Sequence, residues 1–305
     1  MEKTVIQKIR RTTTVSLLAG LCCLLVPPQP CRAADGRSCP APPDTAVCLP
    51  DGAEAGFASS LPSKHVINTQ MVSAGVTDIL DTYLSAEKFS GPEVRYLSHT
   101  LRDRVGRPLS TEILHQVILS SADTRGGGST LLTAMYNLQW GLHHLWRLTP
   151  RLSLRAGGLA DLNIGVMYDT GNSNNPAQAR LSLSVDPAVL LRWQILDGRF
   201  PVALQYEAAL PLVGVAFSPQ YGQSYYEIFS RGNYDHNVVL TGPWNALTYH
   251  QMATVDFSVG RHTTFRLGYL GDYRQMKVNS LKYHQFTHAF VIGWVRTFNI
   301  VPVSR

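Results

Sequence analysis

The segment 152-LSLRAGGLADLNIGVMY-168 places apolar residues at its even positions and most of its polar residues at odd positions. A period of two gathers the apolar side chains on one face of a β-strand, and no helix can bury such a pattern. The pattern returns in 179-ARLSLSVDPAVLLRWQI-195, now with the apolar residues at odd positions. The polar segment Asp169–Pro176 separates the two runs. We therefore predict two antiparallel strands joined by a loop.

The length of these runs indicates the class of fold. Strands in globular sheets average about five or six residues, and each of these runs is roughly three times as long. Long paired strands with one apolar and one polar face are typical of a barrel wall in lipid. The sequence predicts an all-β protein, a transmembrane antiparallel up-and-down β-barrel of about ten strands. Twelve strands are the alternative, if the long connection 218–245 or the segment Gln275–Tyr283 contributes a hairpin.

The same alternation, with weaker patterns near the N-terminal end, predicts the remaining strands. The ten expected strands cover residues 69–85, 94–104, 111–123, 132–146, 152–168, 179–195, 200–217, 247–259, 264–274 and 286–298. Ser90-Gly91-Pro92 is expected to be a turn. The turns at 106, 149, 197 and 261 are short and fall on one side, whereas the connections at 169 and 218 are long and fall on the other. Short periplasmic turns and long extracellular loops are typical of bacterial outer-membrane barrels.

The N-terminal residues predict export. A basic stretch precedes the apolar segment Val15–Val26, and Ala33 and Ala34 provide small residues for cleavage. We expect residues 1–34 to be a signal peptide; a lipidated Cys22 is the weaker alternative, because Leu21 stands where a lipidation site wants a small residue. Residues 35–65 are expected to be a periplasmic lead-in rich in Pro and Gly, in which Cys39 and Cys48 are spaced to form a disulfide. The barrel is expected over 66–298, with a C-terminal tail at 299–305, in the bacterial cell outer membrane.

Composition excludes several classes of function. The net charge of +6 is spread along the chain, whereas a nucleic-acid surface needs clustered Lys and Arg. No apolar run approaches the roughly twenty residues of a transmembrane helix. Because phosphate-binding, dinucleotide-binding and zinc-binding motifs are missing from the sequence, we expect no cofactor and no metal site. The expected partners are outer-membrane lipid and lipopolysaccharide, with barrel-assembly machinery recognising the terminal aromatic residue Phe298 during biogenesis. The oligomeric state is left open.

The residues at the alternate positions that face the barrel interior are mostly polar or charged. They include Arg155, Asp161, Asn163, Arg180, Asp186, Arg192, Gln205, Glu207, His250, Asp256, Arg266 and Asp272. In a barrel of eight to ten strands such side chains fill the interior as a network of ion pairs and hydrogen bonds. The alternative is a narrow polar channel, which would need a barrel of twelve or more strands.

The longest predicted extracellular connection, 218–245, carries a dense polar and aromatic cluster. The candidate binding residues there are Tyr221, Tyr225, Tyr226, Arg231, Tyr234 and His236. We expect a non-enzymatic surface, structural or binding barrel that uses this loop. The alternative is a lipid or lipopolysaccharide hydrolase with His236 as base. Ser230 is its leading nucleophile, with Ser224 as the other choice, and Asp235, Glu227 or Asn237 would orient the base.

Four segments of the chain resemble a known family. They are 68–85, 174–180, 217–237 and 268–273, and they are similar to an uncharacterised Bacteroidota outer-membrane β-barrel family, a domain of unknown function of the DUF3316 type. The resemblance covers about residues 66–298. It implies an exported outer-membrane barrel, and it implies no activity and no catalytic residue.

Overall fold

A computed structural model describes residues 64–104, 106–259 and 263–300, without the side chains of residues 299 and 300. The predicted signal peptide, almost all of the predicted lead-in with Cys39 and Cys48, the turn around Arg261 and most of the predicted tail lie outside the described residues.

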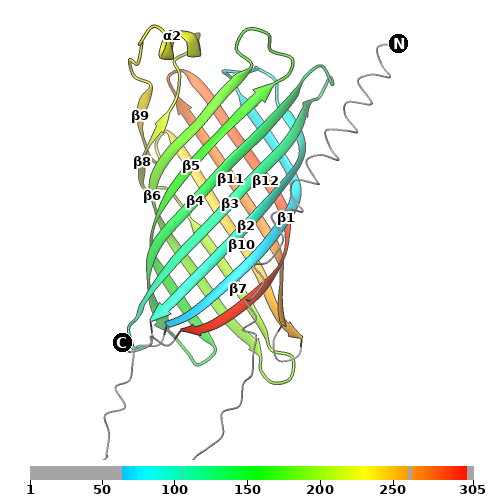
Figure 1. The fold of residues 1–305 in the computed structure, drawn as a ribbon, viewed down its shortest axis with the longest axis vertical. Helices are drawn as coiled ribbons and strands as arrows, with labels where there is room; N and C mark the ends of the chain where they lie inside the picture. Colours follow the sequence, from blue (N-terminus) through cyan, green and yellow to red (C-terminus); the bar gives the residue numbers. More distant parts are fainter. Residues whose placement is uncertain (1–63, 105, 260–262, 301–305) are drawn as a thin grey trace, which may run out of the picture. The chain divides into compact units, whose positions relative to one another are not determined.

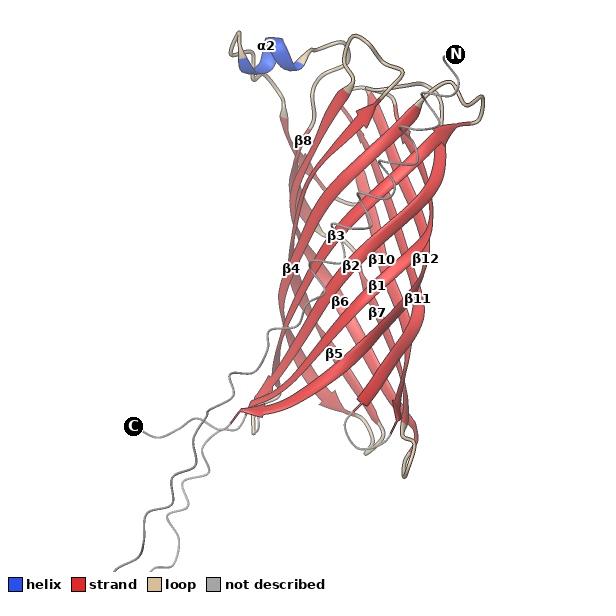
Figure 2. Ribbon diagram, turned by 45° about the vertical axis from the view of Figure 1, so that its right-hand side comes forward, coloured by secondary structure: helices blue, strands red, loops and turns tan. Residues whose placement is uncertain are grey.

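The described chain is built of long antiparallel strands. They are β1 (Lys64–Asp81), β2 (Phe89–Arg104), β3 (Leu109–Thr124), β4 (Thr130–Arg147), β5 (Leu152–Asp169), β6 (Ala177–Leu196), β7 (Val202–Ala209), β8 (Val213–Phe217), β9 (Val238–Thr241), β10 (Ala246–Val259), β11 (Thr263–Val278) and β12 (Leu281–Ile300), with one short helix, α2 (Tyr225–Phe229), between β8 and β9. The order is β5-β4-β3-β2-β1-β12-β11-β10-β7-β6, and β5 also pairs with β6. These ten strands therefore close a barrel, as predicted (Figures 1 and 2). The short strands β8 and β9 extend the wall beside β6.

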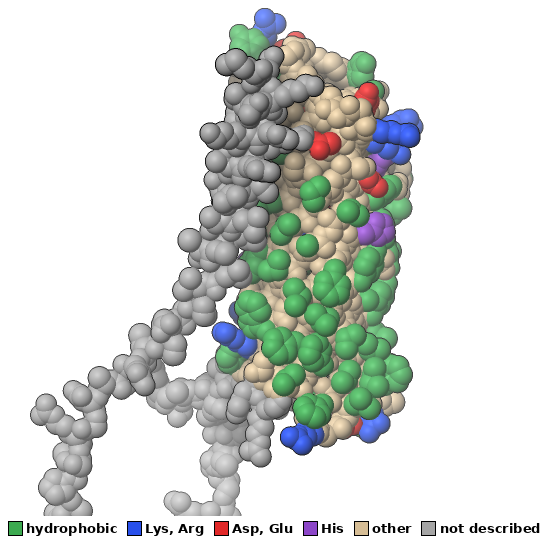
Figure 3. All heavy atoms as spheres, turned by 90° about the vertical axis from the view of Figure 1, so that its right-hand side faces the viewer, with side chains coloured by type: hydrophobic (Ala, Val, Ile, Leu, Met, Phe, Trp, Pro, Cys, Tyr) green, Lys and Arg blue, Asp and Glu red, His purple; other side chains and the backbone are tan. Residues whose placement is uncertain are grey.

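Alternating burial along the strands separates the outer face from the interior. In β4, Leu132, Tyr136 and Trp140 are exposed, whereas Met135 and Asn137 between them are buried. Hydrophobic side chains cover the middle and lower part of the face in Figure 3, and most charged side chains lie toward its two ends. This distribution suits a wall surrounded by hydrocarbon. Within the described residues no helix is long and apolar enough to span a membrane.

The strand predicted over 200–217 is interrupted. β7 ends at Ala209 and β8 begins at Val213, so three residues, 210–212, stand opposite two residues of β6, Asp186 and Pro187. One extra residue on one strand is a β-bulge, which bends that strand. The prediction of one continuous strand over 200–217 is therefore wrong, and the bend starts a hairpin of β8 and β9.

Pro211 explains why the pairing of β7 with β10 stops at this place. The N–H groups of Leu210 and Leu212 donate to Pro187 and Val185 of β6, 3.2 and 3.0 Å away. The residue between them therefore faces β10, and a proline has no N–H to donate there. The register of β7 with β10 ends at the pair of Ala209 and His250.

The turn predicted at Ser90-Gly91-Pro92 is also wrong. The chain reverses at residues 82–88, and β2 already begins at Phe89. Gly91 and Pro92 keep their register with β1, where Pro92 stands opposite Val76, but neither has a partner in β3. The pairing with β1 keeps Pro92 inside a strand, although the residue type favours a turn.

Candidate functional site

The connection between β8 and β9 is a folded cap and not an open loop. Helix α2 starts with a capping box, in which Ser224 accepts the N–H of Glu227 and the Glu227 carboxylate accepts the N–H of Ser224, 2.8 Å away. This bond from a backbone N–H holds the pKa of Glu227 below its usual range. Gly222 and Gly232, with φ of 78° and 70°, allow the sharp turns on either side of the helix.

Hydrogen bonds fix this cap to the barrel. The Tyr225 hydroxyl donates to the side chain of Gln178 and accepts the N–H of Ala179 in β6, at 2.8 and 2.7 Å. Tyr83, which follows β1, donates its hydroxyl to the carbonyl of Gln223, 3.0 Å away. Burial raises the pKa of both tyrosines, which therefore stay protonated at neutral pH.

A second anchor joins the cap to the hairpin between β11 and β12. The Asn279 side chain donates to the carbonyls of Ser218 and His236, each 3.0 Å away. Within the cap, Asn237 donates to the carbonyl of Ser218 and to Gln223, at 3.2 and 2.7 Å. The cap is therefore held at both its first and its last residues.

The predicted binding residues divide into two groups. Tyr221, Tyr226 and Tyr234 are 75, 63 and 61% exposed, and Arg231 and His236 are also exposed. The Arg231 guanidinium lies 5.5 Å from the centre of the Tyr226 ring. Tyr225 instead packs edge to face on Tyr83, with ring centres 5.8 Å apart. Five of the six residues thus face outward, and Tyr225 holds the cap in place.

The predicted catalytic residues are only partly brought together. His236 Nδ1 lies 2.6 Å from the Asp235 carboxylate, and both side chains are about three-quarters exposed. Ser230 ends α2, where its N–H donates to the carbonyl of Tyr226 at 2.9 Å. Among the contacts of the described residues, none joins the Ser230 hydroxyl to His236.

The barrel interior contains the expected polar network, and several of its bonds cross from wall to wall. Arg95 of β2 binds Asp272 of β11 at 2.7 Å, and Arg274 of β11 donates to Asn163 of β5 at 2.8 Å. Arg180 of β6 pairs with Asp81 of β1 and lies over the Tyr283 ring. The side chains thus fill the lumen as predicted for a ten-stranded barrel.

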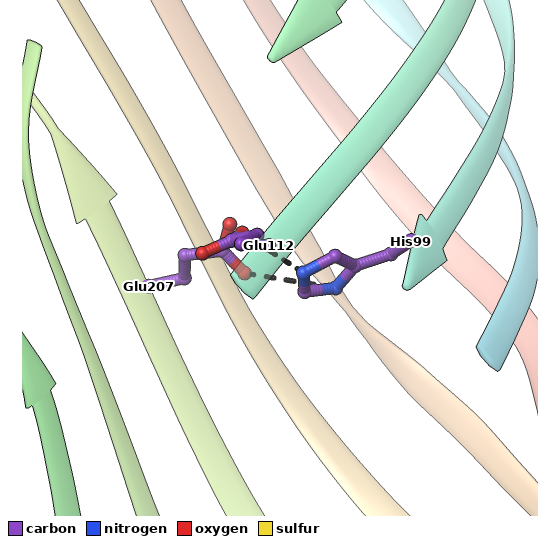
Figure 4. A group of neighbouring side chains, drawn as sticks. All are labelled: His99, Glu112 and Glu207. Atoms are coloured by element: carbon purple, nitrogen blue, oxygen red, sulfur yellow. Dashed lines mark hydrogen bonds and ion pairs between the residues drawn. The ribbon is translucent and has the colours of Figure 1, made fainter. Parts of the chain in front are cut away.

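A separate group of His and Glu side chains lies in the interior (Figure 4). One donor atom each of His99 in β2, Glu112 in β3 and Glu207 in β7 lie within 4.8 Å of one another. His99 Nε2 is 2.9 Å from Glu112 Oε1, and His143 Nε2 of β4 is 2.7 Å from Glu112 Oε2. All four residues are at most 3% exposed.

Of these four residues, only Glu207 was predicted from the sequence to face inward. Neighbouring residues of a strand point to opposite faces, and the structure buries His143 and exposes His144. His99, Glu112 and Glu207 come together only because the barrel closes. His99 and Glu112 occupy positions that alternate with the outward-facing residues of β2 and β3. This alternation could have identified them, but it is weak in both strands.

Two cavities lie at opposite ends of the interior. A cavity of about 100 Å³ lies near the bulge of β7 and β8, and its lining includes Asp186, Ala209, Pro211, His250, Asp272 and Arg274. The other end opens into a cavity of about 710 Å³ lined by Asp103, Arg104, Arg107, Arg147, Arg155 and Arg192, among other residues. The second cavity is strongly basic, which suits anions better than cations.

Solved structures with a similar fold include bacterial outer-membrane barrels. The outer membrane protease OmpT from Escherichia coli is 8% identical with a TM-score of 0.43, and the match covers 80% of this chain and 98% of that one. The translocator domain of the autotransporter NalP from Neisseria meningitidis is 10% identical, with 79 and 90% covered and a TM-score of 0.34. An outer membrane channel from Pseudomonas putida F1 is 12% identical, with 81 and 100% covered and a TM-score of 0.36.

Comparison with curated proteins found no match. A family model described as "Protein of unknown function (DUF3316)" matches residues 45–305, which include the whole barrel. The resemblance noted in the sequence is thus confirmed at the level of the family, while the origin in Bacteroidota and the signal peptide stay predictions. The chain belongs to the family of proteins of unknown function called DUF3316.

Proposed function

We propose that this protein is a non-enzymatic barrel of the bacterial outer membrane that binds the saccharide part of lipopolysaccharide through the cap, residues 218–237 of the long connection 218–245. The observation that carries the proposal is the exposure of Tyr221, Tyr226 and Tyr234 on a cap that hydrogen bonds hold to the barrel. Tyrosine rings offer large contact areas at a low entropic cost, and a cap already folded loses little further freedom on binding.

The proposed location rests on the apolar exterior of the closed barrel and on the placement of the cap at one end (Figure 1). Outer-membrane fractions on a denaturing gel test it. A compact band that shifts on boiling is expected, because closed barrels resist detergent until they are heated. A soluble periplasmic protein with no shift would contradict the location.

Binding to lipopolysaccharide tests the ligand. Tyr221→Ala and Tyr234→Ala are each expected to weaken binding by roughly tenfold, as for aromatic residues central to an interface. Tyr168→Ala, which removes an exposed tyrosine of the wall in β5, serves as the matched control and should bind like the wild type. Equal binding by all variants, each shown to be folded by its shift on heating, would contradict the proposal.

The pairing of His236 with Asp235 at 2.6 Å favours one second candidate, a lipid or lipopolysaccharide hydrolase. Such an enzyme would use Ser230 as nucleophile after a movement that brings its hydroxyl to His236. Replacing His236 with Ala separates the two candidates. Loss of a measured hydrolysis with an intact barrel would favour the enzyme, whereas the binding barrel has no hydrolysis to lose.

A narrow channel is the third candidate, and the large cavity at the end opposite the cap favours it. The wall-to-wall bonds of Arg95 with Asp272 and of Arg274 with Asn163 oppose it. Conductance steps in planar bilayers would support a channel, and their absence would exclude it.

A further inference from the structure

We propose that His99, His143, Glu112 and Glu207 form a binding site for one divalent transition-metal ion inside the barrel, with Zn²⁺ the best-fitting ion. The first argument is the chemistry of the donors. Imidazole nitrogens with carboxylate oxygens suit first-row transition metals, whereas Ca²⁺ and Mg²⁺ prefer oxygen ligands alone.

The second argument is geometry. A tetrahedral zinc site with bonds of about 2.0–2.2 Å keeps its donor atoms roughly 3.3 Å apart. Here His143 Nε2 and His99 Nε2 lie 2.7 and 2.9 Å from the two oxygens of Glu112, and His99 Nδ1 lies 4.0 Å from Glu207 Oε2. One donor atom each of His99, Glu112 and Glu207 lie within 4.8 Å of one another, and His143 Nε2 contacts the same Glu112 carboxylate. Side-chain rotations that turn one nitrogen of each ring and one oxygen of each carboxylate to a common point place the four donors around one ion. The donors come from β2, β3, β4 and β7, so a bound ion links two parts of the wall.

The third argument is the imbalance of charge at the two glutamates. Glu93, another glutamate of the interior, pairs with Arg95 at 2.5 Å. For Glu112 and Glu207, the described residues include no Lys or Arg that makes an ion pair with them. The nearby Arg266 is bound to Asp256 through two hydrogen bonds of 2.6 and 2.9 Å.

A buried carboxylate oxygen of Glu207 has no partner, which is the fourth argument for a bound ion. Glu207 is 3% exposed, and its Oε2 has no hydrogen-bond partner among the described residues. A buried carboxylate oxygen without a partner is costly, and such atoms call for an explanation, of which an ion is one. Histidine protonation alone leaves this oxygen 4.0 Å from the nearest ring nitrogen, beyond hydrogen-bond distance.

The route of the ion sets the design of the experiment. The cavity at the end of the barrel opposite the cap is lined by basic side chains that repel a cation, namely Arg104, Arg107, Arg147, Arg155 and Arg192. We infer that the ion enters before the barrel closes. The untagged barrel is therefore refolded in detergent with Zn²⁺ or Co²⁺, desalted, and analysed for metal by mass spectrometry. X-ray absorption of the zinc-loaded wild type then reports the ligands directly.

About one ion per chain is expected in the wild type, bound by nitrogen and oxygen with no sulfur. Glu207→Gln and His143→Gln should lower the affinity at least about tenfold, the lower end of what even indirect supporting groups contribute to metal sites. Glu93→Gln, which neutralises a buried glutamate outside the cluster, is the matched control and should keep the ion. A shift on heating establishes that each variant is folded.

Two results would overturn the site. The first is a folded wild type that retains no Zn²⁺ or Co²⁺ after refolding in its presence. The second is equal retention by the wild type and Glu207→Gln, which would place the ion on surface histidines such as His115 or His144. Because lipopolysaccharide binding depends on the cap, neither result bears on the proposed function.

Discussion

Glu112 of β3 and Glu207 of β7 approach each other across the barrel interior, with one carboxylate oxygen of each and one His99 nitrogen all within 4.8 Å of one another. Two buried carboxylates repel each other unless they share a proton or a metal cation lies between them. Without a metal ion, Glu207→Gln should therefore stabilise the barrel by about 1 kcal/mol, as the replacement of buried ionic groups often does. With Zn²⁺ loaded, the wild type should be the more stable protein. Melting curves in chelator and in Zn²⁺ check this reversal, and a variant less stable in both would contradict it.

The ion pair between Arg95 and Asp272 should behave in the opposite way. Both side chains are at most 2% exposed, and the pair joins β2 to β11. Asp272→Ala removes the carboxylate that binds both Arg95 and Arg274; Arg95 keeps Glu93, but Arg274 loses its carboxylate partner. The change should lower the free energy of unfolding by about 3–5 kcal/mol. Asp197→Ala removes the carboxylate of the exposed pair with Arg151 and should change it by less than about 1 kcal/mol. Urea unfolding in detergent measures both, and equal effects would contradict the prediction.

The seam between the first and last strands should not tolerate a side chain at position 75. Gly75 of β1 faces Ala289 of β12, and an added Cβ would lie 2.0 Å from the His288 carbonyl oxygen and 2.7 Å from the Ala289 Cβ. Gly75→Ala is expected to destabilise the closed barrel by about 1–3 kcal/mol, as overpacking does. Gly126→Ala, where nothing lies within 4 Å, is the control. The temperature at which the compact gel band is lost compares them; the same temperature for both would show that the seam adjusts without strain.

The hydroxyl of Tyr225 should keep the cap closed. It makes two hydrogen bonds to β6, of 2.7 and 2.8 Å. Tyr225→Phe removes both and should weaken docking by about 1 kcal/mol or more, which is roughly a fivefold increase in the open population. Tyr226→Phe alters a neighbouring tyrosine that is 63% exposed and should have no effect. Rates of limited proteolysis within 218–237 measure opening, and equal rates for the two variants would rule out this role.

The start of α2 should depend on pH through Glu227. The pKa of Glu227 lies below its usual value of 4.5 because the carboxylate accepts the N–H of Ser224. Its contribution to the helix is therefore fully present above pH 4.5 and is lost as the pH falls through the lowered pKa. Hydrogen-exchange protection of the Ile228 amide, which donates to the Ser224 carbonyl, should fall in that range. Glu227→Gln should remove most of the pH dependence, and unchanged protection in the wild type down to about pH 3 would contradict it.

The alternation of apolar and polar residues within each strand was enough to predict the barrel, because it shows which face of the strand lies in apolar surroundings. The inward positions Arg180, Asp256 and Asp272 were identified from parity alone, and all three are buried. The pattern failed where residue type and register disagreed. Pro92 resembles a turn residue but stays in β2 through its pairing with β1, whereas Pro211 interrupts a strand that the alternation had predicted to continue.

The sequence by itself determined most of the strands and their two faces, since both depend on neighbours within about ten residues of chain, and its family matches over residues 45–305. Only the tertiary structure decided which polar residues meet. His99, Glu112, His143 and Glu207 lie on four strands, and Glu207 follows His143 by more than three strand lengths of chain. Their contact requires β6 to pair with β5 and β7 to continue the wall until the barrel closes. When the barrel closes, the register of every strand pair together sets the distances among these four residues. The alternation within one strand does not determine the register of the other strands.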